Sequence, residues 1–240
     1  MRQTAAAAVA ALALFAARAT AQAPHVEVQV FVEAGCPFSR RFLHGPMADT
    51  IYAPGMRDIL DFALSPFGNA FYKTQACGSP CKYNSTVRKC YNRACGLGVA
   101  CKPQDCFAGE PVCQHGEEEC IGNRYLACAK KHTCNQLEYF SFVHCFLGRY
   151  AKSLDAAAFA SVAGACAGAS ANAAAVQECA TGVEGDQLIA AEAGATPYHK
   201  TVPYVLVNGV HIADHDKVLE EVCNAYQGVK PVACGQTLYS

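Results

Sequence analysis

A cysteine followed by a proline, Cys36-Pro37, comes directly after a β-branched, alternating segment and before a run with helical character. Free backbone N–H groups and the positive end of the helix dipole stabilise a thiolate at the first turn of a helix. The thiolate is the form of cysteine that attacks a disulfide sulfur. This arrangement predicts a nucleophilic thiol at Cys36; the alternative is that Cys36 is one half of a structural disulfide.

Ser39 stands three residues after Cys36, where a two-cysteine redox site carries its second thiol. A second cysteine would attack the mixed disulfide and release the reduced substrate, whereas a serine hydroxyl forms no S–S bond. We expect Ser39 either to donate a hydrogen bond to the Cys36 thiolate or to be simply a small residue of the helix. Release of the product would then need an external thiol or another cysteine of this chain.

A second stretch, residues 113–128, reads C-Q-H-G-E-E-E-C-I-G-N-R-Y-L-A-C. Every fixed position of C-Q-H-G-x-x-E-C-x-x-N-x-x-x-x-C is filled, and the stretch resembles the signature of the gamma-interferon-inducible lysosomal thiol reductase (GILT) family. Most members of that family have a second cysteine where this chain has Ser39. We expect the signature to be structural, with a hydrogen-bonded turn rather than a metal or acid-base site at its histidine and glutamate. Its residues are Cys113, Gln114, His115, Gly116, Glu119, Cys120, Asn123 and Cys128.

The resemblance covers nearly all of residues 26–235 and implies an α/β, thioredoxin-like fold with an inserted helical, disulfide-rich region. It implies a thiol-disulfide oxidoreductase that acts on protein disulfides, without cofactor or metal. The departure from the family pattern at Ser39 is expected to reduce its turnover. It also implies a cis peptide bond before Pro203, with Val202 pairing with the substrate chain; Pro197 is the alternative. Only about 5–6% of X-Pro bonds are cis, so the dipeptide alone would not predict one.

The hydrophobic patterns predict an order of elements that agrees with such a fold. A strand is expected over 25–32, a helix from Cys36 past Phe42 with a kink near Gly45-Pro46, and a strand over 56–65. Residues 202–212 read as a strand, an Asn-Gly turn and a strand, and Asp214 can cap a last helix over about 215–226. Helices are expected between these parts at about 117–131, 135–150, 153–165, 172–181 and 185–194.

The chain divides into four parts on these grounds. Residues 1–21 are expected to be a secretory signal peptide, because Arg2 precedes an apolar run that is too short to span a bilayer. An uncleaved membrane anchor is the alternative. Residues 22–74 and 195–240 would form the thioredoxin-like core, 75–112 a Cys-rich insertion, and 113–194 the signature and helical insertion.

Sixteen cysteines in a chain with a leader indicate disulfides and an oxidising compartment. The sequon at Asn84 agrees with glycosylation in the secretory pathway. Zinc is the competing interpretation for the six cysteines between 77 and 106, but the chain has no C-x-x-C spacing. Fifteen cysteines remain besides Cys36 and cannot all pair. We therefore expect Cys134 to be a thiol, a substitute resolving cysteine, or a bridge in a disulfide-linked dimer.

Charge and composition exclude some classes of function. The chain has 19 basic and 20 acidic residues and no tryptophan, which argues against a nucleic-acid partner and a Trp-based carbohydrate platform. No stretch after residue 25 is long and apolar enough to span a membrane. The expected partners are disulfide-containing proteins and a small-molecule thiol reductant, in a lysosomal or extracellular location. The competing interpretations are a redox-impaired binding protein and a disulfide isomerase or holdase.

Overall fold

The computed structural model describes residues 23–72, 106–107, 109–168 and 172–235. The expected signal peptide, the sequon at Asn84 and the cysteines at 77, 81, 90, 95 and 101 lie outside these residues. None of the helices in the described ranges is long and apolar enough to cross a membrane.

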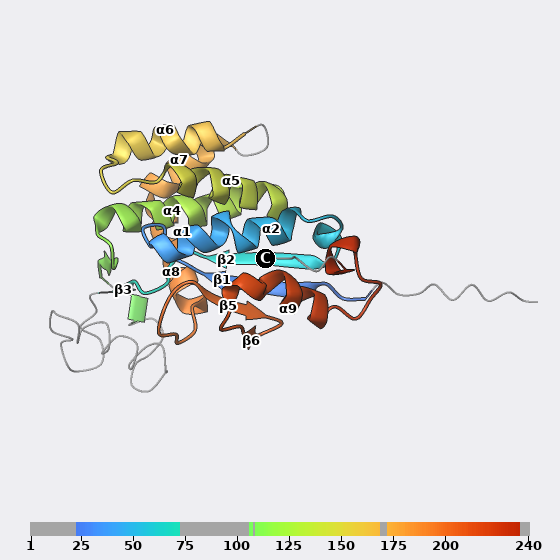
Figure 1. Cartoon of the computed structure of the whole chain (residues 1–240). Coiled ribbons are helices and arrows are strands. Elements are labelled where there is room, and N and C mark those ends of the chain that lie inside the picture. Colours follow the sequence, from blue (N-terminus) through green and yellow to red (C-terminus); the bar gives the residue numbers. More distant parts are fainter. Residues whose placement is uncertain (1–22, 73–105, 108, 169–171, 236–240) are drawn as a thin grey trace, which may run out of the picture.

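A four-stranded sheet of order β2-β1-β5-β6 forms the centre of the molecule (Figure 1). Strand β1 (Val26–Phe31) pairs in parallel with β2 (Leu60–Ser65) and antiparallel with β5 (Tyr204–Val207). Strand β6 (Val210–His211) forms a hairpin with β5. Asn208 and Gly209 both have positive φ, at 48° and 77°, which is the geometry expected of the predicted Asn-Gly turn.

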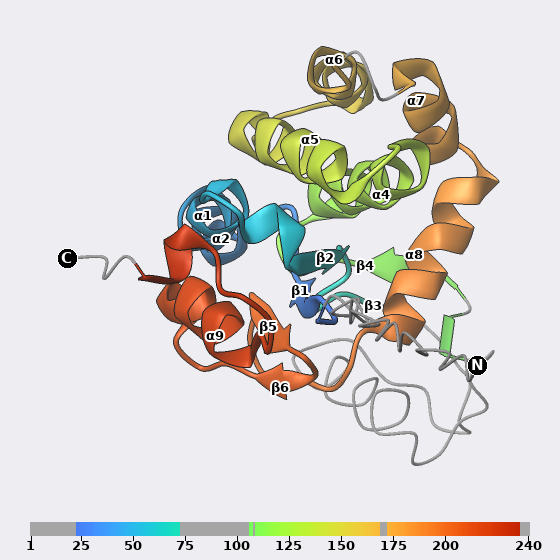
Figure 2. The same cartoon turned by 90° about the vertical axis from the view of Figure 1, so that its right-hand side faces the viewer.

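Helices cover both sides of this sheet. Figure 2 shows α1 (Pro37–His44), α2 (Pro46–Tyr52) and α9 (Val218–Ala225) on one side and α8 (Val183–Ala195) on the other. A short second sheet pairs β3 (Phe71–Tyr72) with β4 (Pro111–Val112). The expected kink at Gly45-Pro46 is confirmed as a break between two helices, because Pro46 begins α2.

The region after the signature is helical, as predicted. Helices α4 (Glu117–His132) and α5 (Gln136–Arg149) pack beside the β2 edge of the sheet, and α6 (Ala156–Cys166) and α7 (Ala173–Thr181) lie outside them. The Gln136 amide pairs with the Leu60 carbonyl and the Phe62 N–H, so it covers the open edge of β2. An amide side chain here prevents that edge from pairing with another strand.

Two predicted boundaries are wrong, and the start of the last helix is confirmed. The strand expected from Met56 begins only at Leu60, because Gly55, in the left-handed region at φ 80°, starts a 3-10 turn over Met56–Asp58. The helix expected from 153 begins at Ala156, after Asp155 caps the N–H of Ala158. The last helix begins with a 3-10 turn, His215–Lys217, capped by Asp214 as expected.

Aromatic side chains fill the space between the sheet and the helical region. Phe146 is fully buried and stacks on Tyr125, Phe142 and Phe159, with ring centroids 5.5–6.1 Å apart. Phe140 meets Phe62 of β2 edge-on at 5.2 Å. Burial of several aromatic side chains in one cluster provides a large share of the hydrophobic stabilisation. The strands that carry the site therefore pack against the helical region.

Four disulfides join described residues: Cys113–Cys120, Cys128–Cys179, Cys145–Cys166 and Cys223–Cys234. Cys106 is also disulfide-bonded. The Cys145–Cys166 bond joins α5 to the end of α6. Cys36 and Cys134 belong to no disulfide in the described part of the chain, as the parity of the cysteines predicted.

Cys134 lies beyond the end of α4 that is farther from Cys36. It follows α4, whose first turn touches the Cys36 loop and whose 16 residues span about 24 Å. Its neighbour Gln136 contacts Leu60, at the start of β2, whereas Cys36 follows the end of the parallel strand β1. Cys134 is therefore too far from Cys36 to attack its mixed disulfide within the same chain, and the expectation of a substitute resolving cysteine is wrong.

Candidate active site

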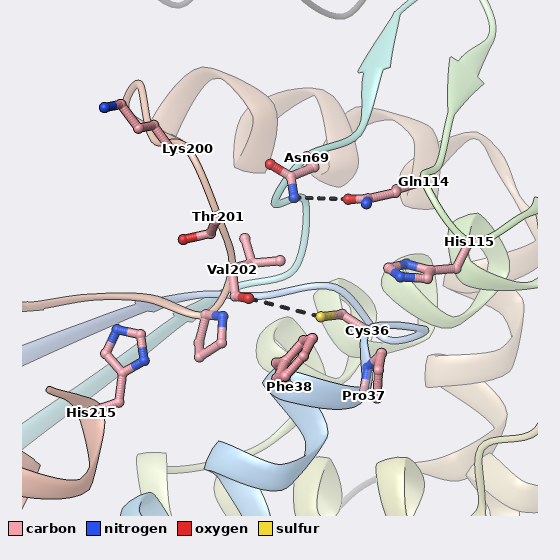
Figure 3. A pocket seen from close by; sticks show the side chains of 11 residues that line it. Cys36, Pro37, Phe38, Asn69, Gln114, His115, Lys200, Thr201, Val202 and His215 are labelled. Atoms are coloured by element: carbon pink, nitrogen blue, oxygen red, sulfur yellow. Dashed lines mark hydrogen bonds between the residues drawn. The ribbon is translucent and has the colours of Figure 1, made fainter. Parts of the chain in front are cut away.

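Cys36 lies where the sheet topology brings three segments together. It is the N-cap residue of α1, five residues after the end of β1, and is 4% exposed. Because Phe31 of β1 pairs with Tyr204 of β5, the loop after β1 faces the residues that precede β5. The Val202–Pro203 bond there is cis, as expected. The Cys36 thiol contacts the Val202 carbonyl oxygen at 3.9 Å (Figure 3).

A cavity of about 480 Å3 opens at this thiol. Its wall includes Cys36, Phe38, His115, Lys200, Val202 and His215. Phe38 is 68% exposed at the edge of the cavity, where its ring can contact a bound molecule. The thiol is thus nearly buried in the protein and still reachable from an open, partly apolar pocket.

Residues of the signature hold the loop that carries Cys36. Asn123 Oδ1 accepts a hydrogen bond from Ala34 N at 2.8 Å, and Glu119 Oε2 accepts one from Gly35 N at 3.2 Å. A Cβ atom on Gly35 would lie 2.6 Å from Glu119 Oε2, so only glycine permits this approach. The first two turns of α4 therefore fix the backbone directly before Cys36.

His115 lies between two fully buried carboxyl groups. Its Nδ1 is 2.6 Å from Glu119 Oε2 and 3.5 Å from Glu33 Oε2, and its backbone N–H donates to Glu119 Oε1 at 3.1 Å. Glu33 and Glu119 are both 0% exposed. Glu33 Oε1 accepts from Asn69 N at 2.6 Å. The predicted hydrogen-bonded turn at His115 and Glu119 is present, and it is also part of the wall around Cys36.

The other signature residues support this turn. Gln114 Oε1 accepts from Asn69 Nδ2 at 2.9 Å, so the signature and the loop after β2 are joined at the cavity. Gly116, at φ 110°, is the N-cap residue of α4. The three signature cysteines are all in disulfides, Cys113 with Cys120 and Cys128 with Cys179.

Ser39 is buried and faces the strand rather than the thiol. Its Oγ accepts a hydrogen bond from Glu33 N at 3.5 Å. Within the described residues, the hydrogen bond of the Cys36 thiol goes to Val202 and none joins it to Ser39. In this arrangement Ser39 closes the loop of residues 33–39.

Two ionisable groups near the site have shifted pKa values. Burial lowers the pKa of His215; the charge of His211 adds to the shift, and Asp214 and Asp216 oppose it. Burial raises the pKa of Tyr150 to about 12, with smaller contributions from Glu119 and Glu118 and an opposing one from Arg40. The Tyr150 hydroxyl would meet a Cβ on Gly35 at 3.1 Å, so a neutral phenol lies against the loop.

Two groups of side chains are close enough to share a metal ion in the described part of the chain. One is Glu33, Cys36 and His115 at the cavity. The other is His132, Cys179 and Glu184, where Cys179 is already bonded to Cys128 and offers no thiolate. Only the first group has the chemistry of a metal site.

The sequence patterns did not indicate Glu33 or Asn69 as site residues, nor that the signature would lie beside Cys36. A charged residue directly after the apolar end of β1 was the available signal for Glu33, because a buried carboxylate requires partners. Asn69 had no comparable signal, since its role depends on contacts with residues far away in the chain.

Comparisons with known proteins agree with this geometry. The family model for gamma interferon inducible lysosomal thiol reductase (GILT) matches residues 27–108 and 99–181. A goldfish (Carassius auratus) protein named gamma-interferon-inducible lysosomal thiol reductase is 30% identical, over 89% of this chain and 73% of its own length. The mouse (Mus musculus) protein of that name is 28% identical, over 88% and 72%. An Arabidopsis thaliana gamma-interferon-responsive lysosomal thiol protein is 28% identical, over 85% and 72%. The chain belongs to the GILT family.

Proposed function

We propose that this protein is a thiol-disulfide oxidoreductase that reduces protein disulfides through the single nucleophile Cys36. The relatives named thiol reductases support reductase activity in general. The parallel β1-α1-β2 unit, the antiparallel β5-β6 hairpin and the cis bond before β5 support a thioredoxin-like fold. The names of the relatives also favour a lysosomal location.

The observation that carries the proposal is the position of the Cys36 thiol. It lies at the N-terminus of α1, where backbone N–H groups stabilise a thiolate, and at the floor of an open cavity. The cis bond directs the Val202 carbonyl toward the sulfur. A substrate chain that lies along residues 200–203 would place its disulfide against Cys36, and the exposed Phe38 would contact its apolar side chains.

The reaction would proceed by two kinds of exchange step. The Cys36 thiolate attacks one sulfur of the substrate disulfide; a mixed disulfide forms and the other substrate sulfur leaves as a thiolate, which takes a proton from water. An external thiolate attacks the mixed disulfide at Cys36 and releases the second substrate thiol. A second external thiol then frees Cys36. Two external thiols are oxidised to one disulfide while one substrate disulfide is reduced.

The assay is turnover of a protein disulfide at neutral pH with an excess of a small thiol. Cys36→Ser should abolish turnover. Cys134→Ser, which changes the second cysteine of the described residues that forms no disulfide, should leave turnover unchanged. Ser39→Cys should raise turnover, because an internal thiol replaces a bimolecular step.

Three other outcomes would contradict disulfide reduction through Cys36. Absence of turnover in the wild-type protein, together with a Cys36 that traps no substrate, would favour the binding protein. Rearrangement of a scrambled disulfide substrate without net reduction would favour the isomerase. Turnover that survives in Cys36→Ser would show that another residue is the nucleophile.

A further inference from the structure

Three side chains of different chemistry converge beside the cavity, where Cys36 and His115 line its wall and Glu33 is buried behind them. Glu33, Cys36 and His115 each offer one ligand atom, and these atoms lie within 4.8 Å of one another. Thiolate, imidazole and carboxylate are the ligands that Zn2+ uses in proteins, and three of them with one open position form an accessible zinc site. The spacing in the sequence does not indicate such a site, because His115 comes from a distant segment.

The charges at the cluster favour a cation. Glu33 and Glu119 are fully buried carboxyl groups that share His115. A thiolate and a carboxylate are anionic ligands, so a divalent cation bound between Cys36 and Glu33 would be attracted by both charges.

Two of the three ligands are already oriented. Glu119 Oε2 lies 2.6 Å from His115 Nδ1 and orients the ring beside Glu33 Oε2, which is 3.5 Å from the same nitrogen. A carboxylate that fixes a histidine in this way is the usual outer support of a metal site. The Asn69 N–H holds Glu33 Oε1 at 2.6 Å, and Oε2 is the oxygen near His115.

An ion can reach the cluster from solvent. Cys36 and His115 both line the cavity of about 480 Å3, and Figure 3 shows the His115 ring directed into it on the side of Cys36. The sulfur that would bind the ion is the one that would attack a disulfide. An ion and a substrate therefore exclude each other.

We propose that Cys36, His115 and Glu33 bind one Zn2+, or a similar borderline-soft divalent ion, with water as the fourth ligand, and that this ion inhibits the protein. On binding, the Cys36 thiol gives its proton to solvent as the S–Zn bond forms, and no oxidation or reduction takes place. Binding does not depend on the proposed function, whereas inhibition rests on it.

The test is titration of the full chain with Zn2+ and with Cd2+ at neutral pH, in the absence of added thiols. Calorimetry should give one high-affinity ion per chain, and Cd2+ should produce the near-ultraviolet absorption of a cadmium–thiolate bond. Cys36→Ser should abolish that absorption. His115→Gln and Glu33→Gln should each weaken binding at least about tenfold, since each removes a ligand.

Two matched variants serve as controls. His215→Gln removes a histidine of the same cavity that is not in the cluster, and Cys134→Ser removes a thiol elsewhere; both should bind the ion as the wild type does. Because Glu33 is buried and its variant could misfold, the partly exposed His115 provides the decisive substitution.

The proposal is overturned if His115→Gln binds the ion as tightly as the wild type, or if Cys134→Ser rather than Cys36→Ser removes the absorption. A wild-type protein that binds one ion through Cys36 but reduces no disulfide would reject the proposed function and retain the metal site. An active protein that binds no ion would reject the metal site and retain the proposed function.

Discussion

Glu119 connects the signature to the nucleophile, and its replacement by glutamine tests that connection. Its carboxyl group is 0% exposed and accepts three hydrogen bonds, from Gly35 N, His115 N and His115 Nδ1. Glutamine has almost the same shape but only one acceptor oxygen, and its NH2 group is a donor. In either orientation of the amide, one of the two backbone N–H groups faces another donor.

The expected loss follows from these bonds. A buried N–H without an acceptor costs about 1–3 kcal/mol, and hydrogen bonds to a charged group exceed neutral ones by about 1 kcal/mol. Glu119→Gln should therefore lower the free energy of unfolding by about 2–4 kcal/mol, a large part of the roughly 5–15 kcal/mol typical of a domain. It should also slow the alkylation of Cys36 or make it heterogeneous, because Gly35 loses its support.

The assay is urea unfolding followed by far-ultraviolet circular dichroism, with the disulfides intact. Glu117→Gln is the matched control, since Glu117 lies in the same first turn of α4 but is exposed. Both variants lose the same favourable interaction with the helix dipole, so their difference isolates the buried bonds. A difference within about 0.5 kcal/mol would refute the role assigned to Glu119.

Three further predictions concern the core, the loop beside the site and the dependence on pH. Phe146→Ala should lower the free energy of unfolding by about 3–5 kcal/mol in urea titrations, because the ring is fully buried among other aromatic rings. Gly68→Ala should destabilise the fold and reduce disulfide turnover, because Gly68 has φ 53° and a Cβ would lie 2.5 Å from Glu33 Cγ. Burial, and then nearby positive charges, lower the pKa of His44 from 6.5. The unfolded chain then binds this proton more readily than the folded protein, so stability is lost as the pH falls below 6.5 toward the lowered value. His44→Gln should make this loss of stability on acidification smaller.

Each of these has a control or a contrary outcome. A loss below about 1 kcal/mol for Phe146→Ala would mean that the aromatic cluster is not packed as described. Gly209→Ala also places alanine at a positive φ, of 77°, but its Cβ would meet nothing within 4 Å. Gly209→Ala should lower the free energy of unfolding only by the backbone strain, about 1–2 kcal/mol. If Gly68→Ala lowers it by the same amount, the clash of its Cβ with Glu33 contributes nothing. Melting curves that shift equally with pH in the wild type and His44→Gln would contradict the role of His44.

Local patterns predicted most elements of the fold. Alternating β-branched residues indicated β1, the Asn-Gly pair indicated the β5-β6 turn, and Asp214 indicated a cap. The start of β2 was placed too early, because Met56–Asp58 forms a 3-10 turn before the strand begins at Leu60. Gly55, in the left-handed region, decides this through backbone geometry, which the pattern of apolar residues does not report.

The candidate site was only partly predictable. The Cys36-Pro37 turn, the cis bond at Pro203 and the odd cysteine Cys134 were expected from the sequence or from the family resemblance. Of the two roles expected for Ser39, the hydrogen bond to the Cys36 thiol is not found in the described part of the chain, and Ser39 Oγ accepts a hydrogen bond from Glu33 N. A serine in the first helical turn can point either way, and the packing of the loop decides which.

The sequence by itself determined which residues could do chemistry, because thiol nucleophilicity, cysteine parity and turn preferences depend on residue type and near neighbours. Only the tertiary structure decided that Glu119, His115 and Asn123 hold the loop before Cys36, and that Cys134 is too far away to resolve its mixed disulfide. These relations join segments about 80–100 residues apart. They depend on how α4 packs beside the end of β1, and hydrophobic periodicity carries no information about that packing.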